Sequence, residues 1–117
     1  MKYPPELNPV KNFLEEYRAC AGSEPYIISN SKNRKFLESS GITYKEVYDI
    51  LKKHLSPEHC YAGPEDDDNP GRPLGAVYKF KYPWNEYEIY IKLKVPLDEK
   101  IRWKATICFS FHEVNDI

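Results

Sequence analysis

The residues of this chain best suited to chemistry lie on two stretches near its C-terminal end. Tyr90, Lys92 and Lys94 alternate with apolar residues in the first stretch, and Ser110 and His112 do so in the second. Side chains two positions apart on a strand point to one face, so neighbouring strands of this kind place a phenol, ammonium groups and an imidazole together. Histidine moves protons near neutral pH, and lysine stabilises negative charge developing on phosphate oxygens. The set suits metal-independent phosphoryl transfer in RNA, with His112, Lys92 and Tyr90 as catalytic residues.

Further residues of the same region could hold RNA. Tyrosine stacks on unpaired bases and lysine pairs with phosphates, which makes Tyr78 and Lys94 RNA-binding candidates. Thr106 is expected on the same face, whereas the side on which Tyr78 lies is left open. An ordinary solvated sheet face is one alternative. Two others are a noncatalytic domain whose tyrosine-rich face or acidic loop docks another protein, and a face that binds single-stranded nucleic acid without cleaving it.

Three helical segments are predicted ahead of these strands. In the first, Asn8 offers an N-cap, Pro9 fits the first turn, and Gly22 fits the end of an amphipathic helix. A second short helix is expected over residues 32–39. Thr43 and Glu46 have the spacing of a capping box and predict the start of a third helix.

Period-two alternation predicts the sheet. Strands are expected over 76–82, 87–95 and 101–112, with a short edge strand at 26–28. In the last strand Ile107, Phe109 and Phe111 should face the core. The predicted fold class is α+β, with N-terminal helices packed on a three- to four-stranded antiparallel sheet. One domain, 1–117, is expected, with a loose leader at 1–7 and an exposed acidic Pro/Gly loop at 62–74.

Composition limits the classes of function. The net charge of −1 does not indicate a strongly basic nucleic-acid binder. Cys20, Cys60 and Cys108 are odd in number and form no CxxC pair, so we expect reduced thiols and no disulfide. The acidic run at 65–68 could suggest a calcium loop, but the EF-hand spacing is missing, and no metal or cofactor is expected. Without a long apolar run or a signal-peptide core, a cytoplasmic protein that does not span a membrane is expected.

Several stretches of the sequence also resemble those of a known protein family. The helical stretch RKFLESSGITYKEVYDILKKHLSPEHCY is followed by Tyr-x-Lys-Leu at 90–93 and by Ser-Phe-His at 110–112. Over residues 26–113 this order resembles the MqsR-like toxins of the RelE-type toxin–antitoxin ribonucleases. The resemblance implies a metal-independent endoribonuclease, an mRNA interferase, whose partners are single-stranded mRNA and a cognate antitoxin.

The residues implied by this resemblance are Tyr61, Tyr90 and His112, with Lys92 as a neighbour. The chain departs from the family pattern at Ala62, where a lysine is expected, and near residues 77–78, where a glutamine is expected.

Overall fold

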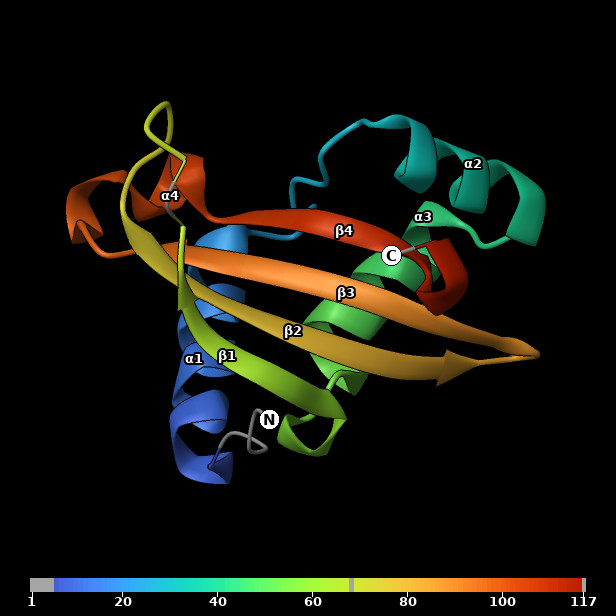
Figure 1. Ribbon diagram of the computed structural model, residues 1–117, viewed down its shortest axis with the longest axis horizontal. Helices are drawn as coiled ribbons and strands as arrows, with labels where there is room; N and C mark the ends of the chain where they lie inside the picture. The colour runs from blue at the N-terminus through green and yellow to red at the C-terminus, as the bar shows by residue number, and fades with distance from the viewer. Residues whose placement is uncertain (1–5, 68, 117) are drawn as a thin grey trace.

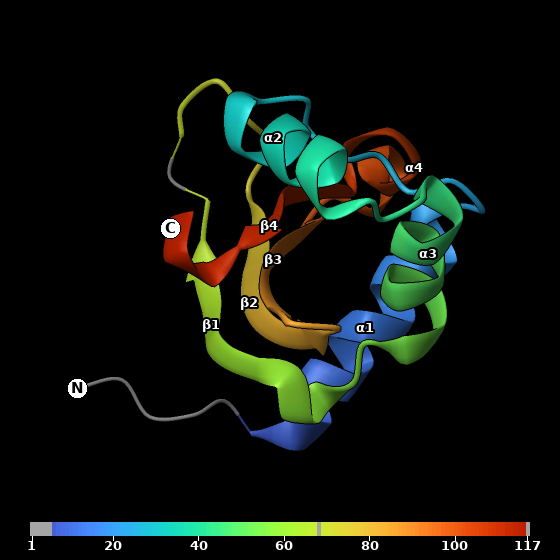
Figure 2. The same ribbon diagram turned by 90° about the vertical axis from the view of Figure 1, so that its right-hand side faces the viewer.

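Helices precede strands along this chain, and the helices cover one side of a curved sheet (Figures 1 and 2). The computed structural model describes residues 6–67 and 69–116. Within them the helices are α1 (Leu7–Ala21), α2 (Ser31–Ser40), α3 (Tyr44–Asp49) and α4 (Arg102–Ala105). The strands are β1 (Cys60–Asp66), β2 (Gly75–Trp84), β3 (Tyr87–Pro96) and β4 (Ile107–Glu113). The predicted α+β fold is confirmed: the sheet has four antiparallel strands in the order β1-β2-β3-β4.

The predicted apolar stripe of α1 packs into the hydrophobic core. Val10, Phe13, Leu14 and Tyr17 are all buried, because they recur on one face of the helix. The start of the helix differs from the prediction, since Glu6 rather than Asn8 is its N-cap and Leu7 is already helical. Residues 1–5 of the expected leader lie outside the described residues.

The second and third helices begin as their capping residues predict. The side chain of Asn30 accepts a hydrogen bond from the backbone N–H of Asn33, and Gly41 ends α2 in the left-handed conformation with φ of 78°. The Thr43–Glu46 capping box starts α3. A π-helical turn, Ile50–His54, continues α3 and carries its apolar face to Leu51.

Alternation along β2 and β3 decides which sheet face meets the helices. Ile89, Ile91, Leu93 and Val95 are buried against the helices, as predicted. Phe80 on β2 faces the same way, so both central strands contribute to one core. In this core the apolar side chains of α1, α3 and the sheet interlock.

The segment between the helices and β2 is more ordered than predicted. Residues 62–66, expected in the acidic loop, belong to β1, which pairs with β2 through two register irregularities. Proline and glycine in this segment argued against a strand, but the free edge of β2 supplies backbone partners for it. The turn between β1 and β2 therefore starts at Asp67, which is 8% exposed, and Asp68 of the predicted acidic run lies outside the described residues.

The last strand corrects two predictions. Residues 99–105 form a 3-10 turn followed by α4, not strand, and the side chain of Asp98 caps that turn by accepting from the N–H of Lys100. A bulge then interrupts β4, because Lys92 pairs with Ser110 whereas Leu93 pairs with Cys108. Phe109 is left without a partner in the register, so Cys108 takes its expected place in the core.

The outer edge of β4 is covered by the N-terminal half of the chain. Ile28 and Tyr26 exchange backbone hydrogen bonds with Cys108, so the predicted strand at 26–28 is reduced to a short parallel bridge. Beyond it, the fully buried side chain of Asn33 donates to the carbonyl oxygen of Phe109 at 3.0 Å and accepts from the N–H of Phe111 at 2.9 Å. An amide side chain thus does the pairing that a fifth strand would do.

Among the described residues, no helix is long and apolar enough to cross a membrane.

Candidate functional site

One face of the sheet is turned away from α1 and α3 (Figure 2), and it carries polar residues from all four strands. Residues directly opposite one another in an antiparallel pair point to the same side. The register places Lys81 opposite Tyr90, Tyr90 opposite His112, and Lys92 opposite both Lys79 and Ser110. We call this surface the outer face, and its residues are Tyr61, Lys79, Lys81, Tyr90, Lys92, Phe109, Ser110 and His112.

Tyr90 and His112 lie on one face, and the register of β3 and β4, which the alternating pattern left open, makes them direct neighbours. Their ring centroids lie 5.4 Å apart. Nδ1 of His112 lies 2.9 Å from the carbonyl oxygen of Glu113. A carbonyl oxygen can only accept a hydrogen bond, so in the neutral ring Nδ1 carries the proton and Nε2 is the basic nitrogen. His112 is only 3% exposed, so the imidazole lies in the floor of the outer face.

Tyr61 extends this aromatic group from β1. Its ring centroid lies 6.4 Å from that of Tyr90. Burial, with Tyr90 close by, raises the pKa of Tyr61 to about 12, and burial also raises the pKa of Tyr90. Both phenols are therefore protonated at neutral pH and act as hydrogen-bond donors, not as bases.

Lysines surround the aromatic group. The ammonium of Lys81 lies 4.6 Å from the ring centroid of Tyr61. Lys79 is held by Glu65 at 2.8 Å, whereas Lys92, opposite it, has no carboxylate partner among the described residues. Glu65 therefore compensates one of the two opposed charges, and the ammonium of Lys92 is the one that an anion could bind.

Two predicted RNA-binding residues do not lie on this accessible surface. Tyr78 is on the helix-covered side, where its ring packs 4.4 Å from that of Phe13. Lys94 points to the outer side but is 1% exposed, because its ammonium binds Asp67 at 2.7 Å and the carbonyl oxygen of Pro73. Thr106 precedes the strand and is buried with its hydroxyl unpartnered.

Lys79 and Lys81 are residues that the sequence analysis missed. Their signal was present, because Tyr78 and Phe80 are apolar and alternate with them along β2. Lys79 is also the register partner of Ala62 on the neighbouring strand β1.

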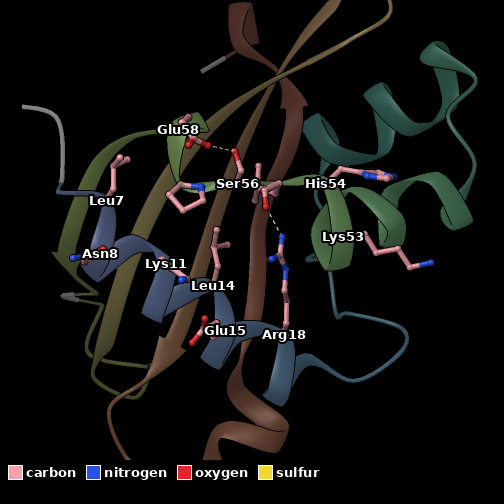
Figure 3. A pocket seen from close by; sticks show the side chains of 12 residues that line it. Leu7, Asn8, Lys11, Leu14, Glu15, Arg18, Lys53, His54, Ser56 and Glu58 are labelled. Carbon is pink, nitrogen blue, oxygen red and sulfur yellow. Dashed lines mark hydrogen bonds between the residues drawn. The ribbon is translucent and has the colours of Figure 1, made fainter.

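A separate pocket of about 460 Å³ lies on the other side of the molecule, between α1 and residues 53–58 (Figure 3). Arg18 crosses its floor and donates to the carbonyl oxygens of Leu51 and Leu55, which satisfies the end of the third helix. Leu7, Leu14 and Pro57 make its wall largely apolar. None of the outer-face residues lines this pocket, and we assign the chemistry to the outer face, where the predicted Tyr90, Lys92 and His112 lie together.

In the described part of the chain, no group of three or more His, Cys, Asp or Glu side chains is placed to hold a metal ion. Comparison of the chain with known protein families, curated proteins and solved structures finds no match. The fold and the site therefore define the class by themselves: a small α+β domain whose sheet face away from the helices combines tyrosines, lysines and one histidine.

Proposed function

We propose that the outer face binds single-stranded RNA and that the chain cleaves it, as a toxin-like endoribonuclease of the MqsR/RelE kind that an antitoxin protein neutralises. The observation that supports the proposal is the meeting of Tyr61, Tyr90 and His112 with Lys81 and Lys92 on one face. Four strands contribute to that group, although Tyr61 lies 51 positions before His112 in the chain.

The binding step follows from the chemistry of these side chains. Phosphates pair with Lys81 and Lys92, and an unpaired base stacks on the ring of Tyr61, which is partly exposed, whereas Tyr90 beside it is buried. Bases of a duplex are already stacked and do not reach such rings, so single strands are preferred. The affinity must fall with salt, because cations released from the phosphates drive part of the binding.

In the cleavage step the ribose 2′-hydroxyl attacks the adjacent phosphorus. Nε2 of His112 accepts the hydroxyl proton as the new O–P bond forms, and the bond to the 5′-oxygen of the next nucleotide breaks. That oxygen takes up a proton on leaving, and the products are a 2′,3′-cyclic phosphate and a 5′-hydroxyl end. Lys92 stabilises the charge that gathers on the phosphate oxygens, and Tyr90 donates a hydrogen bond to them.

The test is incubation of purified protein with single-stranded RNA in EDTA, followed by mapping of the cleaved ends. We expect 2′,3′-cyclic phosphate ends from the wild type and loss of cleavage, by about 100-fold or more, in Lys92→Ala and His112→Ala. Lys35→Ala removes an equal charge from the exposed side of α2 and is the matched control, with unchanged cleavage expected. Undiminished cleavage by both outer-face variants would remove the assigned roles.

The burial of His112 favours a second candidate, a face that binds single-stranded RNA without cleaving it. An imidazole that is 3% exposed meets a ribose hydroxyl only if its surroundings open. Salt-sensitive binding that Lys81→Ala and Lys92→Ala weaken, without any cleaved ends, identifies this candidate. Equal affinity in Lys81→Ala, Lys92→Ala and Lys35→Ala contradicts both candidates.

A further inference from the structure

The bulge in β4 turns an aromatic ring out of the core. By alternation Phe109 belongs with Phe111 on the helix side, but the bulge leaves it unpaired and brings Cys108 to the core in its place. A small thiol thus occupies an inner position that a phenyl ring could have filled. Bulges recur beside functional sites, where they re-aim a side chain.

Two cations cover the displaced ring. The guanidinium of Arg72 lies 4.6 Å from the ring centroid of Phe109, and the ammonium of Lys92 lies 5.4 Å from it. A planar guanidinium stacks on an aromatic face much as a nucleobase does. The side chain of Arg72 is 41% exposed, and its carboxylate neighbour Asp67 is 3.8 Å away, so it can leave the ring without stranding a buried charge.

The backbone around Arg72 is fixed at both ends. Lys94 binds Asp67 before Arg72 and the carbonyl oxygen of Pro73 directly after it. A side chain at Gly75 would collide with this arrangement, since a Cβ there would lie 2.6 Å from the carbonyl oxygen of Val95 and 2.9 Å from Cε of Lys94. Arg72 is therefore held beside the ring by its backbone, while its guanidinium is free to turn.

We propose that Phe109 is a stacking subsite for one unpaired base of a bound RNA strand, and that Arg72 is the group which that base displaces. The freed guanidinium then pairs with a phosphate of the same strand. Phe109 lies three positions along β4 from His112, roughly 7–10 Å, so this base belongs to a different nucleotide from the one at Tyr61 and Tyr90. The subsite rests on the proposed RNA binding but not on cleavage.

Crosslinking locates the base directly. Short single-stranded RNAs carrying 5-iodouridine at one position each are irradiated with the full chain, and the crosslinked peptide is identified by mass spectrometry. We expect one position of the RNA to crosslink to Phe109. We expect Phe109→Leu, which keeps an apolar side chain but removes the ring, to lose that crosslink and to bind RNA about tenfold more weakly. Thermal melting confirms that the variant is folded.

Two further variants separate the subsite from a structural role of the ring. Tyr26→Leu removes a ring that is 63% exposed and lies outside the outer face, and it should leave the affinity unchanged. Arg72→Ala should keep the Phe109 crosslink but reduce the slope of log affinity against log salt by about 0.7, the value for one phosphate contact on a single strand. The subsite alone is overturned if the wild type binds RNA without a crosslink in β4 and Phe109→Leu binds RNA with the same affinity as the wild type. If the wild type binds no RNA at all, the proposed function fails and the subsite fails with it.

Discussion

Replacing Asp67 with alanine should be among the most destabilising single substitutions in this protein. The carboxylate of Asp67 and the ammonium of Lys94 are 2.7 Å apart, and their side chains are only 7% and 1% exposed. Removing one partner of a buried ion pair costs about 3–5 kcal/mol, because the remaining charge is left in a medium that solvates it poorly. The free energy of unfolding of a small protein is usually about 5–15 kcal/mol, so this loss would be a large part of it.

Urea unfolding at pH 7 measures the effect. With a slope of about 2 kcal/mol per molar urea, the midpoint of Asp67→Ala should fall by about 2 M. Glu99→Ala is the matched control, because Glu99 is 84% exposed and lies 3.8 Å from Arg102, and it should change stability by less than about 1 kcal/mol. Asp67→Ala combined with Lys94→Met should be more stable than Asp67→Ala alone, because no charge is then buried. Equal midpoints for Asp67→Ala and Glu99→Ala would refute this reasoning.

The same pair gives a signed dependence on pH. Burial alone would raise the pKa of Asp67, but hydrogen bonds from Lys94 and Asn69 and the charge of Arg72 outweigh it, so the pKa lies below its ordinary value. The contribution of this group is therefore complete above the ordinary pKa of about 3.9 and is lost as the pH falls through the lower folded value. Between pH 5 and pH 3 the wild type should lose more stability than Asp67→Ala does.

Three further substitutions test other parts of the structure. Tyr17→Phe should raise the free energy of unfolding by about 1 kcal/mol, seen as a higher urea midpoint, because the buried hydroxyl of Tyr17 has no partner; a lower midpoint contradicts this. Asn33→Ala should lower that free energy by about 2–4 kcal/mol and cause concentration-dependent association in light scattering, because the edge of β4 loses its pairing; a stable monomer contradicts it. Burial lowers the pKa of His59, whose Nδ1 accepts a hydrogen bond from the N–H of Ser56. Below about pH 6.5 this histidine takes up a proton more readily in the unfolded chain than in the folded one, so the free energy of unfolding should fall as the pH drops. His59→Gln should remove that slope in urea titrations between pH 7 and 5.

The helices and strands that depend on a local residue pattern could be predicted from the sequence. The stripe of α1, the Thr43–Glu46 capping box and the alternation along β3 each depend on residues within a few positions of one another. The same alternation predicted that Tyr90 and His112 share one face of the sheet, but it left their register open, because the turn before the last strand can be closed in several ways.

Features set by distant contacts were not predictable in this way. The bulge that moves Phe109 outward accompanies the bridge from Ile27 to Cys108, far away in the sequence. Lys94 had the pattern of a surface residue, and only Asp67, 27 positions earlier, buries it. Strand β1 contains Gly63 and Pro64, which disfavour a strand locally, and it forms because β2 offers an unpaired edge.

The hydrogen bonds of the Asn33 side chain also matter while the protein is being synthesised. This side chain reaches across 76 and 78 positions to Phe109 and Phe111 in β4, which follows the other three strands in the chain. Since α2 is translated long before β4, the group that closes this border of the sheet is waiting when the strand emerges. The intramolecular partner of these two backbone groups is therefore already translated when β4 emerges, which limits the time in which nascent chains could pair with one another.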